Sequence, residues 1–284
     1  MKTILTIFIL LLVPFFGISQ SIEKFSIDSG GASSTVGNIE ILYTIGEVTI
    51  NEFSNGSIQV SEGFINPLQL SISMNPKIIL EGPSIGGGLM SDNLRGNNII
   101  PLTSPYPDAM GAMASVFTVT GNDAVVDWVY VSLMDKMDQS VEIASTSGFV
   151  QVDGDIVKEN GVDALTFDVA ANDYYVRIIH RNHLAILTAA PVTLNGGGST
   201  LDLTADPLAI FEGVNAVADL GGIFAMISGD VDSNGQIQNI DVNNVRPQIG
   251  VSGYLNIDAD MNGQVQNTDI NLYIRPNLGR GIQF

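Results

Sequence analysis

One acidic segment occurs twice near the carboxyl end of the chain. Residues 230–241 read DVDSNGQIQNID, and residues 258–269 read DADMNGQVQNTD. The similarity continues past each segment, where Arg246-Pro247 matches Arg275-Pro276 with a one-residue insertion in the second copy. Because the two copies share their acidic and glycine positions, they are expected to share one local fold, and this constrains the carboxyl end more tightly than any other feature.

Each copy has the spacing of a calcium-binding loop. In a twelve-residue calcium loop, side chains at positions 1, 3 and 5, a carbonyl at position 7 and a carboxylate at position 12 supply oxygen ligands. The first copy offers Asp230, Asp232, Asn234, the Gln236 carbonyl and Asp241, and the second offers Asp258, Asp260, Asn262, the Gln264 carbonyl and Asp269. Two calcium ions are therefore the expected cofactors.

Two further features of the loops support this interpretation. Position 6 is glycine in both, at Gly235 and Gly263, where the chain turns sharply and a Cβ would be strained. Each loop also gathers three carboxylates, which is costly unless a cation neutralises them. Position 12 is Asp where EF-hands have Glu, so the last ligand has a shorter reach. The alternative is a pair of Asx-rich turns on an acidic surface, and the repetition of the pattern argues against it.

Apolar residues at helical spacing follow each loop, and they predict one short helix after each. They are Val242, Val245 and Ile249 in the first copy and Ile270, Ile274 and Leu278 in the second. Pro247 and Pro276 are expected to end or kink these helices because proline cannot donate a backbone hydrogen bond.

Most of the remaining chain alternates apolar and polar residues with period two, which predicts strands. Residues 125–134 are apolar on both faces, which suits a central strand. Asn55-Gly56 before Ile58 signals a hairpin, and residues 91–95 suit one short helix. The expected fold class is mainly β: a β-sandwich preceded by a small β-hairpin unit and followed by the two loop–helix repeats. The expected domains are a signal peptide at 1–19, an amino-terminal β unit at 20–76, a β-sandwich at 77–212, a connecting segment at 213–228 and the calcium repeats at 229–284.

The first nineteen residues have the pattern of a secretory signal peptide. Lys2 precedes an apolar run at residues 4–16, and Gly17-Ile18-Ser19 offers small residues for cleavage before Gln20. The alternative is a membrane anchor, but a spanning helix needs about 20 apolar residues, more than this run provides. The expected location is exported, either at the outer face of the outer membrane or secreted.

Charge and composition exclude several classes of function. The chain has 30 Asp+Glu against 11 Lys+Arg, for a net charge of −19. This balance repels nucleic acid and anionic membrane surfaces, so neither nucleic-acid binding nor direct membrane insertion is expected. The absence of cysteine removes disulfides, thiolate chemistry and a cysteine-linked lipid anchor. With only two histidines, His180 and His183, an enzyme is the minority interpretation.

Several motifs resemble known families. The tandem loop–helix pair ending in Asp resembles the dockerin type I repeat over residues 229–280. A wider set resembles the carboxy-terminal module of large secreted or cell-surface proteins of Bacteroidota, often labelled hemagglutinin-like. That set comprises Leu80–Pro83, Met90–Arg95, Ile100–Leu102, Val126–Val129, Asp173–Val176, His180–Leu184 and Gly229-Asp230. Tyr43–Glu47 and Ser61–Phe64 look like the amino-terminal β segment of proteins handled by the type 9 secretion pathway.

The resemblance implies surface attachment, adhesion or assembly in place of a reaction. Dockerins bind cohesins, but Asn239-Ile240 and Asn267-Thr268 differ from the Ser/Thr pairs common in that role. Cohesin binding is therefore not carried over to this chain.

Four weaker candidates each have a plainer explanation. Asp28–Gly31 looks like part of a serine-protease motif, but both histidines come after the serine, and a turn is favoured. His180 and His183 are interpreted as a structural turn in preference to a two-histidine metal site. Trp128 is interpreted as core in preference to a sugar-stacking platform. Residues 86–88 lack the Lys-Ser/Thr of a phosphate loop and suit a turn.

Three functions follow from these observations, in order of preference. The first is a non-enzymatic, calcium-binding accessory subunit at the bacterial cell surface, held by an outer-membrane or secreted surface protein. The second is a carbohydrate-binding adhesin whose partner is a glycan. The third is an extracellular hydrolase.

Overall fold

The computed structural model describes residues 30–36, 39–45, 51–55, 58–62 and 71–284. The chain divides into two units, Met1–Leu68 and Gln69–Phe284. The predicted signal peptide at 1–19 and the residues Asp28 and Ser29 lie outside the described residues. Among the described residues, no helix is long and apolar enough to cross a membrane.

The described part of the first unit consists of two antiparallel strand pairs. Strand β1 (Gly30–Val36) pairs with β2 (Ile39–Ile45), and β3 (Asn51–Asn55) pairs with β4 (Ile58–Glu62). Asn55 is the register partner of Ile58, which confirms the hairpin predicted from Asn55-Gly56.

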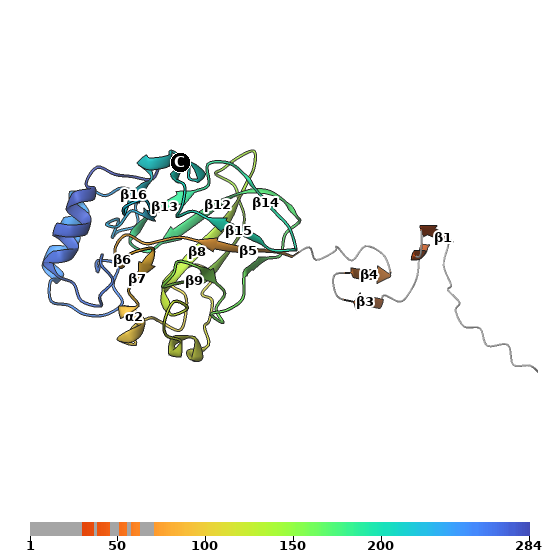
Figure 1. Ribbon diagram of the computed structural model, residues 1–284, viewed down its shortest axis with the longest axis horizontal. Coiled ribbons are helices and arrows are strands. Elements are labelled where there is room, and N and C mark those ends of the chain that lie inside the picture. Colours follow the sequence, from red (N-terminus) through yellow and green to blue (C-terminus); the bar gives the residue numbers. More distant parts are fainter. Residues whose placement is uncertain (1–29, 37–38, 46–50, 56–57, 63–70) are drawn as a thin grey trace, which may run out of the picture. The chain divides into compact units, whose positions relative to one another are not determined.

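The second unit contains two larger sheets (Figure 1). The six-stranded sheet has the order β10-β9-β8-β12-β13, with β14 beside β12, and the three-stranded sheet has the order β11-β5-β15. All of these pairs are antiparallel except the parallel pair β5–β15. The strands are β5 (Ile72–Lys77), β8 (Val125–Asp135), β9 (Glu142–Gln151), β10 (Ile156–Val157), β11 (Leu165–Phe167), β12 (Asn172–His180), β13 (His183–Leu187), β14 (Val192–Leu194) and β15 (Ser199–Asp202).

The main hydrophobic core draws side chains from both sheets, which is consistent with a β-sandwich. It includes Met74 of β5, Val131 of β8 and Leu165 of β11, all fully buried. Strand β8 is buried on both faces between β9 and β12, as its apolar pattern predicts. Trp128 is also fully buried, and its indole nitrogen donates to the Pro101 carbonyl at 2.9 Å, which confirms the core interpretation.

Smaller elements complete the second unit. Strand β6 (Ser84–Gly86) pairs with β7 (Leu89–Met90), and β16 (Val217–Asp219) pairs with β17 (Phe224–Met226). Helix α2 (Asn93–Gly96) confirms the short helix expected near residues 91–95. Short 3₁₀ turns occur at η2 (Ala114–Thr118), η3 (Pro207–Ala209) and η4 (Gly213–Asn215).

Two expected domain limits fall within continuous structure. The limit between residues 76 and 77 lies inside β5, which belongs wholly to the second unit. The segment expected to connect the sandwich to the repeats, 213–228, contributes Val217, Ala225 and Met226 to the main core. The backbone N–H of Met226 donates to the Ile79 carbonyl at 2.8 Å, so this segment is built into the sandwich.

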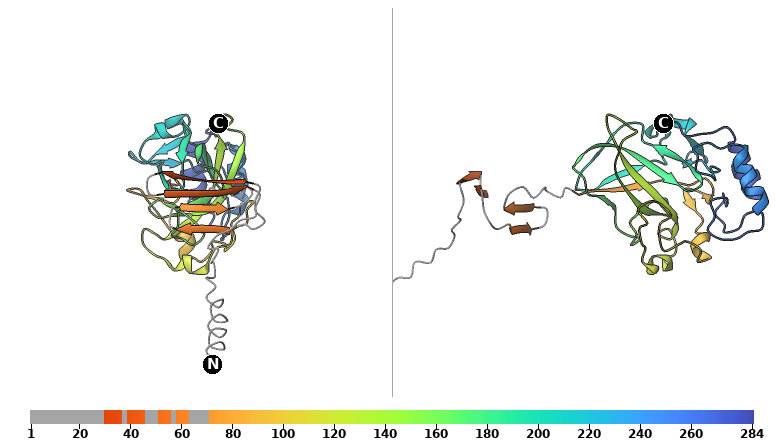
Figure 2. Two further views of the ribbon diagram at one scale, coloured as in Figure 1. Left: turned by 90° about the vertical axis from the view of Figure 1, so that its right-hand side faces the viewer. Right: turned by 180° about the vertical axis from the view of Figure 1, so that it is seen from behind.

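The duplicated repeats lie at one end of the sandwich (Figures 1 and 2). The first loop leads into α3 (Asn239–Val245) and the 3₁₀ turn η5 (Arg246–Gln248). The second leads into η6 (Asp269–Ile274) and the 3₁₀ turn η7 (Arg275–Asn277). Both helices therefore give way to a proline-containing turn, as predicted. Val242, Val245, Ile270 and Ile274 are buried together in a second hydrophobic core.

The repeats differ from the sequence prediction in two details. Ile249 and Leu278 were expected to continue the buried stripe, but they are 43% and 40% exposed because each helix has already ended at its proline turn. Element η6 is a π-helix, with i→i+5 hydrogen bonding, whereas α3 is an α-helix. A π turn accommodates one extra residue, so the one-residue insertion in the second copy explains this difference.

Candidate metal centre

The first loop is closed by two of its own carboxylates, which accept backbone N–H groups. Asp230 accepts from Asn234 at 3.0 Å and from Gly235 at 2.9 Å. Asp241, eleven positions along the chain, accepts from Val231 at 3.0 Å and from Gln238 at 2.8 Å. The first and last predicted ligands therefore hold opposite parts of the loop.

The second loop repeats this arrangement. Asp258 accepts from the N–H groups of Asn262 at 3.3 Å and Gly263 at 2.8 Å. Asp269 accepts from Ala259 at 2.8 Å and from Gln266 at 2.6 Å. The same hydrogen bonds thus form in two segments 28 residues apart, because the same residue types stand at the same loop positions.

The backbone of the two loops also matches. Position 6 has positive φ in both, +82° at Gly235 and +92° at Gly263, which is the conformation that glycine was expected to allow. Position 4 is left-handed in both as well, with φ of 57° at Ser233 and 58° at Met261. A non-glycine residue in this conformation is uncommon, and its occurrence at equivalent positions shows that the loop as a whole imposes it.

The predicted carboxylates converge in both loops. One oxygen from each of Asp230, Asp232 and Asp241 lies within 4.8 Å of the others, and the same holds for Asp258, Asp260 and Asp269. The side-chain oxygens of Asn234 and Asn262 accept the N–H groups of Gln236 and Gln264, each at 2.9 Å. The structure thus brings the three predicted carboxylates of each loop into one compact cluster.

Without a cation, these clusters are electrostatically unfavourable. Burial raises the pKa of Asp230 to about 6, and the neighbouring Asp241 and Asp232 add to the effect. Burial also raises the pKa of Asp258 to about 7 and of Asp269 to about 6, with further contributions from nearby loop carboxylates. The nearby carboxylates raise these pKa values because holding several like charges close together is costly.

The donor set fits a hard cation. Each cluster supplies carboxylate, amide and carbonyl oxygens without His or Cys, which suits calcium and disfavours zinc or copper. Calcium tolerates six to eight oxygens in flexible geometry, whereas magnesium requires a near-ideal octahedron.

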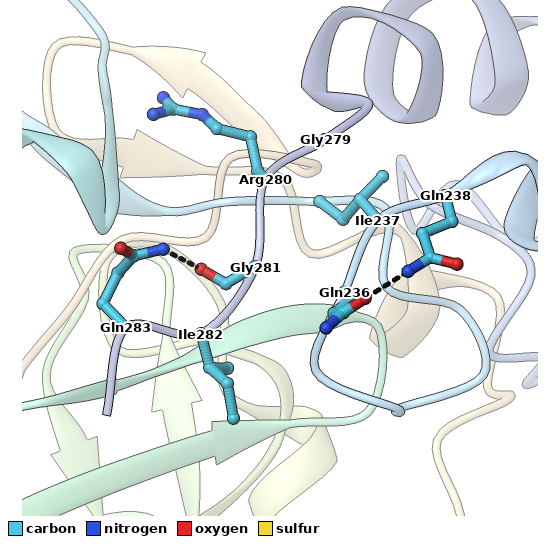
Figure 3. Close-up of a pocket in the computed structure, with 8 residues that line it drawn as sticks. All are labelled: Gln236, Ile237, Gln238, Gly279, Arg280, Gly281, Ile282 and Gln283. Atoms are coloured by element: carbon cyan, nitrogen blue, oxygen red, sulfur yellow. Dashed lines mark hydrogen bonds between the residues drawn. The ribbon is translucent and has the colours of Figure 1, made fainter.

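The two repeats complete each other through an exchanged pairing. Figure 3 shows residues 236–238 of the first loop beside residues 279–283, which follow the second helix. The Ile237 N–H donates to the Arg280 carbonyl and the Gly279 N–H to the Ile237 carbonyl, at 2.8 and 2.9 Å. In the second loop, Val265 makes the equivalent pair of bonds with Val251 and Gly250, both at 2.8 Å. Each loop is thus paired with the segment that follows the other helix.

A buried polar network joins the sandwich to the repeats. Asp127 of β8 accepts from Arg181 Nε at 2.8 Å and from the Tyr254 hydroxyl at 2.6 Å, and it lies 3.2 Å from His180 Nε2. Arg181 also stacks over the Tyr254 ring, with its guanidinium carbon 4.3 Å from the ring centroid. The charge of Arg181 and the hydrogen bond from His180 keep the pKa of Asp127 at about 2, although burial opposes this shift.

The two histidines belong to this network. His183 Nε2 accepts the Gly82 N–H at 3.1 Å, so its Nδ1 carries the proton, and that Nδ1 lies 3.0 Å from His180 Nδ1. Burial lowers the pKa of both histidines. Every ring nitrogen of His180 and His183 thus has a protein partner, which is consistent with the structural-turn interpretation.

Sequence reasoning did not identify Asp127, Arg181, Asn182 or Tyr254 as structurally important. One signal was present, because Asp127 is a lone carboxylate inside the otherwise apolar run 125–134. A buried carboxylate requires a charged or hydrogen-bonding partner, but its partners are 53 to 127 residues away in sequence. The sequence pattern therefore indicates that Asp127 has a partner but does not identify which residue it is.

No family model and no curated protein matches the chain. Two solved structures are similar to it in part: crystal structures of two interface mutants of a type II cohesin–X–dockerin complex from Acetivibrio cellulolyticus. The C-terminal interface mutant is 13% identical with a TM-score of 0.38, covering 74% of this chain and 96% of that chain. The N-terminal interface mutant is 14% identical with a TM-score of 0.36, covering 74% and 95%. At TM-scores this low the likeness carries no argument about fold or function.

Proposed function

We propose that the chain is an exported, non-catalytic interaction module that binds two calcium ions. The observation that supports calcium most strongly is the convergence of three carboxylates in each of two loops with matching hydrogen bonds. In the first loop Asp230, Asp232, Asn234, Asp241 and the Gln236 carbonyl would hold the ion. In the second, Asp258, Asp260, Asn262, Asp269 and the Gln264 carbonyl would do so. The ion supplies positive charge that offsets the repulsion among the carboxylates.

Calcium in these loops has a structural role in this proposal. The loops lie beside the second hydrophobic core, which includes Ile237 and Val265 from the loops themselves. Binding to the folded state alone stabilises it, by about 2.7 kcal/mol at a hundredfold excess over Kd. Extracellular calcium sites often have Kd values of about 10⁻⁴ to 10⁻³ M, so millimolar calcium outside the cell keeps such sites occupied.

The partner we propose is an outer-membrane or secreted surface protein. Apolar side chains on the outer face of the repeats support a protein contact there, since Ile240 is 46% exposed and Leu272 61% exposed. The glycan alternative has weaker support, because the buried Trp128 cannot serve as a stacking platform. Phe284 is the only exposed aromatic side chain among residues 71–284. The hydrolase alternative has weaker support as well, because the ring nitrogens of both histidines are hydrogen-bonded within the fold.

Titration calorimetry on the calcium-free full chain tests the calcium assignment. Two binding events are expected for the wild type. One event is expected for the double variant Asp230→Asn with Asp232→Asn, and one for Asp258→Asn with Asp260→Asn. A wild-type chain that takes up no calcium at millimolar concentration would refute the assignment.

A pull-down from the native envelope tests the protein partner, in millimolar calcium and in chelator. Leu272→Glu is expected to abolish capture of the partner. The matched control is Leu208→Glu, because Leu208 is 75% exposed on η3 of the sandwich, and this variant is expected to capture the partner normally. Equal capture by both variants would show that the partner does not use the outer face of the repeats.

A further inference from the structure

The two-residue loop between β12 and β13 contacts both calcium loops. The Asn182 carbonyl accepts the N–H of Gly229, which directly precedes the first ligand Asp230, at 2.9 Å. The Asn182 side-chain Nδ2 donates to the carbonyl of Asp258, the first ligand of the second loop, at 2.8 Å. One residue of the sandwich thus holds the backbone at the start of both loops, although it belongs to neither.

Arg181 extends these contacts along both loops. Its carbonyl accepts the hydroxyl of Ser233, at position 4 of the first loop, at 2.9 Å. Its Nη1 donates to the Leu255 carbonyl, three residues before the second loop, at 2.5 Å. The same guanidinium is bound to Asp127 through Nε. The sandwich end of this contact is therefore anchored on the central strand β8.

The Asn182 amide has little freedom to rotate. Its exposed fraction is 0%, and its Oδ1 lies 2.7 Å from the protonated Nδ1 of His183. The other nitrogen of His183 is bound to the Gly82 N–H. Because Oδ1 must face His183, Nδ2 must face the Asp258 carbonyl. The orientation of the side chain is thus fixed before any ion binds.

We propose that Asn182 is a positioning residue shared by both calcium loops, which it holds in the binding geometry. This inference rests on the proposed function, because it concerns the affinity of those two sites. A loop with three mutually repelling carboxylates tends to open when it is empty, and closing it costs free energy when the ion binds. Residues outside the ligand set that orient the ligands typically change metal affinity by about 10-fold to 100-fold when they are replaced.

The test uses the two full-length variants in which one loop has been disabled, so that each remaining loop is titrated alone. Adding Asn182→Ala is expected to raise the calcium Kd of the first loop and of the second loop by about 10-fold each. Thr188→Val is the matched control, because the Thr188 hydroxyl accepts the Val176 N–H at 3.1 Å near the far end of β13 and contacts neither loop. This control is expected to lower the melting temperature and leave both Kd values unchanged.

The outcomes separate the inference from the proposed function. If each single-loop protein binds calcium and Asn182→Ala leaves either Kd within twofold, the shared positioning role is wrong and the calcium function stands. If neither single-loop protein binds calcium before Asn182 is changed, both are wrong. Should Asn182→Ala fail to fold, the isosteric Asn182→Asp takes its place, since it keeps the oxygen that faces His183 and loses the Nδ2–H group that donates to the Asp258 carbonyl. It is expected to raise the calcium Kd of the second loop, and unchanged affinity there overturns the inference.

Discussion

Replacement of Asp258 by asparagine is expected to have opposite effects on stability with and without calcium. In the calcium-free protein, Asp258 is one of three carboxylates within 4.8 Å, and burial raises its pKa to about 7. Above that pH the folded chain holds a charge it disfavours. An asparagine side chain has no charge, and its single oxygen can still accept the Gly263 N–H that lies 2.8 Å from Asp258, while the longer bond from Asn262 at 3.3 Å is lost. The variant is therefore expected to be as stable as the wild type in chelator, or more stable.

In calcium the order reverses, because the variant loses the charge of the first ligand. At a hundredfold excess of calcium over Kd, an intact site contributes about 2.7 kcal/mol. For a domain of about 200 residues, each kcal/mol shifts the melting temperature by about 2–4 °C. The variant is therefore expected to melt about 5–10 °C below the wild type in saturating calcium.

Thermal unfolding at about pH 8, followed by the fluorescence of the single tryptophan, measures both differences. Trp128 lies in the sandwich core, so it also reports whether the loops and the sandwich unfold together. The exposed Asp168→Asn serves as the control and is expected to change neither curve. A melting temperature that is lowered equally in calcium and in chelator would refute the reasoning, because it would show that Asp258 supports the fold by its hydrogen bonds alone.

Three further predictions follow from the same structure. The calcium-induced rise in melting temperature is expected to be larger at about pH 8 than at about pH 5.5, because the pKa values of about 6 for Asp230 and about 7 for Asp258 let protons compete with calcium at the lower pH. In the calcium-free protein the loop carboxylates contribute less stability as the pH rises through these values, whereas the buried histidines, whose pKa is lowered, act in the opposite direction. The histidine contribution is the same with and without calcium and therefore cancels in the calcium-induced rise; a rise independent of pH would contradict the carboxylate assignment. Gly82→Ala is expected to cost about 1–3 kcal/mol in urea unfolding, with and without calcium, since the added Cβ would lie 2.0 Å from the Ala259 carbonyl oxygen, whereas Gly96→Ala, with open space around it, is the neutral control. Trp128→Ala is expected to cost about 3–5 kcal/mol of unfolding free energy by urea titration followed by circular dichroism, and a loss below 1 kcal/mol would contradict its place in the core.

The sequence predicted local features well because their causes are local. The hairpin at Asn55, the central strand β8 and the proline-terminated helices follow from turn chemistry and apolar spacing within about ten residues. The six loop carboxylates form two compact clusters because the predicted ligands of one loop lie inside a single twelve-residue segment. Calcium itself stays a prediction until it is titrated.

Features that depend on distant partners were not predicted. Ile249 and Leu278 fit the helical spacing but lie past the proline turns, so the spacing predicted buried residues beyond the point where each helix ends. The contact between Asn182 and the two loops joins residues 47 and 76 positions apart. No periodicity or motif predicts such a contact. The expected domain limits placed Asn182 and the two loops in separate domains, because composition does not indicate which segments share a core.

The exchanged pairing has a consequence for the origin of the repeats. A peptide carrying one loop and one helix would leave two segments without backbone partners: the loop segment around Ile237 or Val265, and the tail that follows the helix. These two segments can pair with each other. Two copies of such a peptide would satisfy each other around a two-fold axis, with each tail beside the other copy's loop. Tandem duplication within one gene would then convert a homodimer into a single folded unit. On this account the ancestral half was a self-associating peptide. Differences between the halves, such as the residue inserted in η6, would have accumulated after fusion, when the two halves no longer had to be identical in sequence.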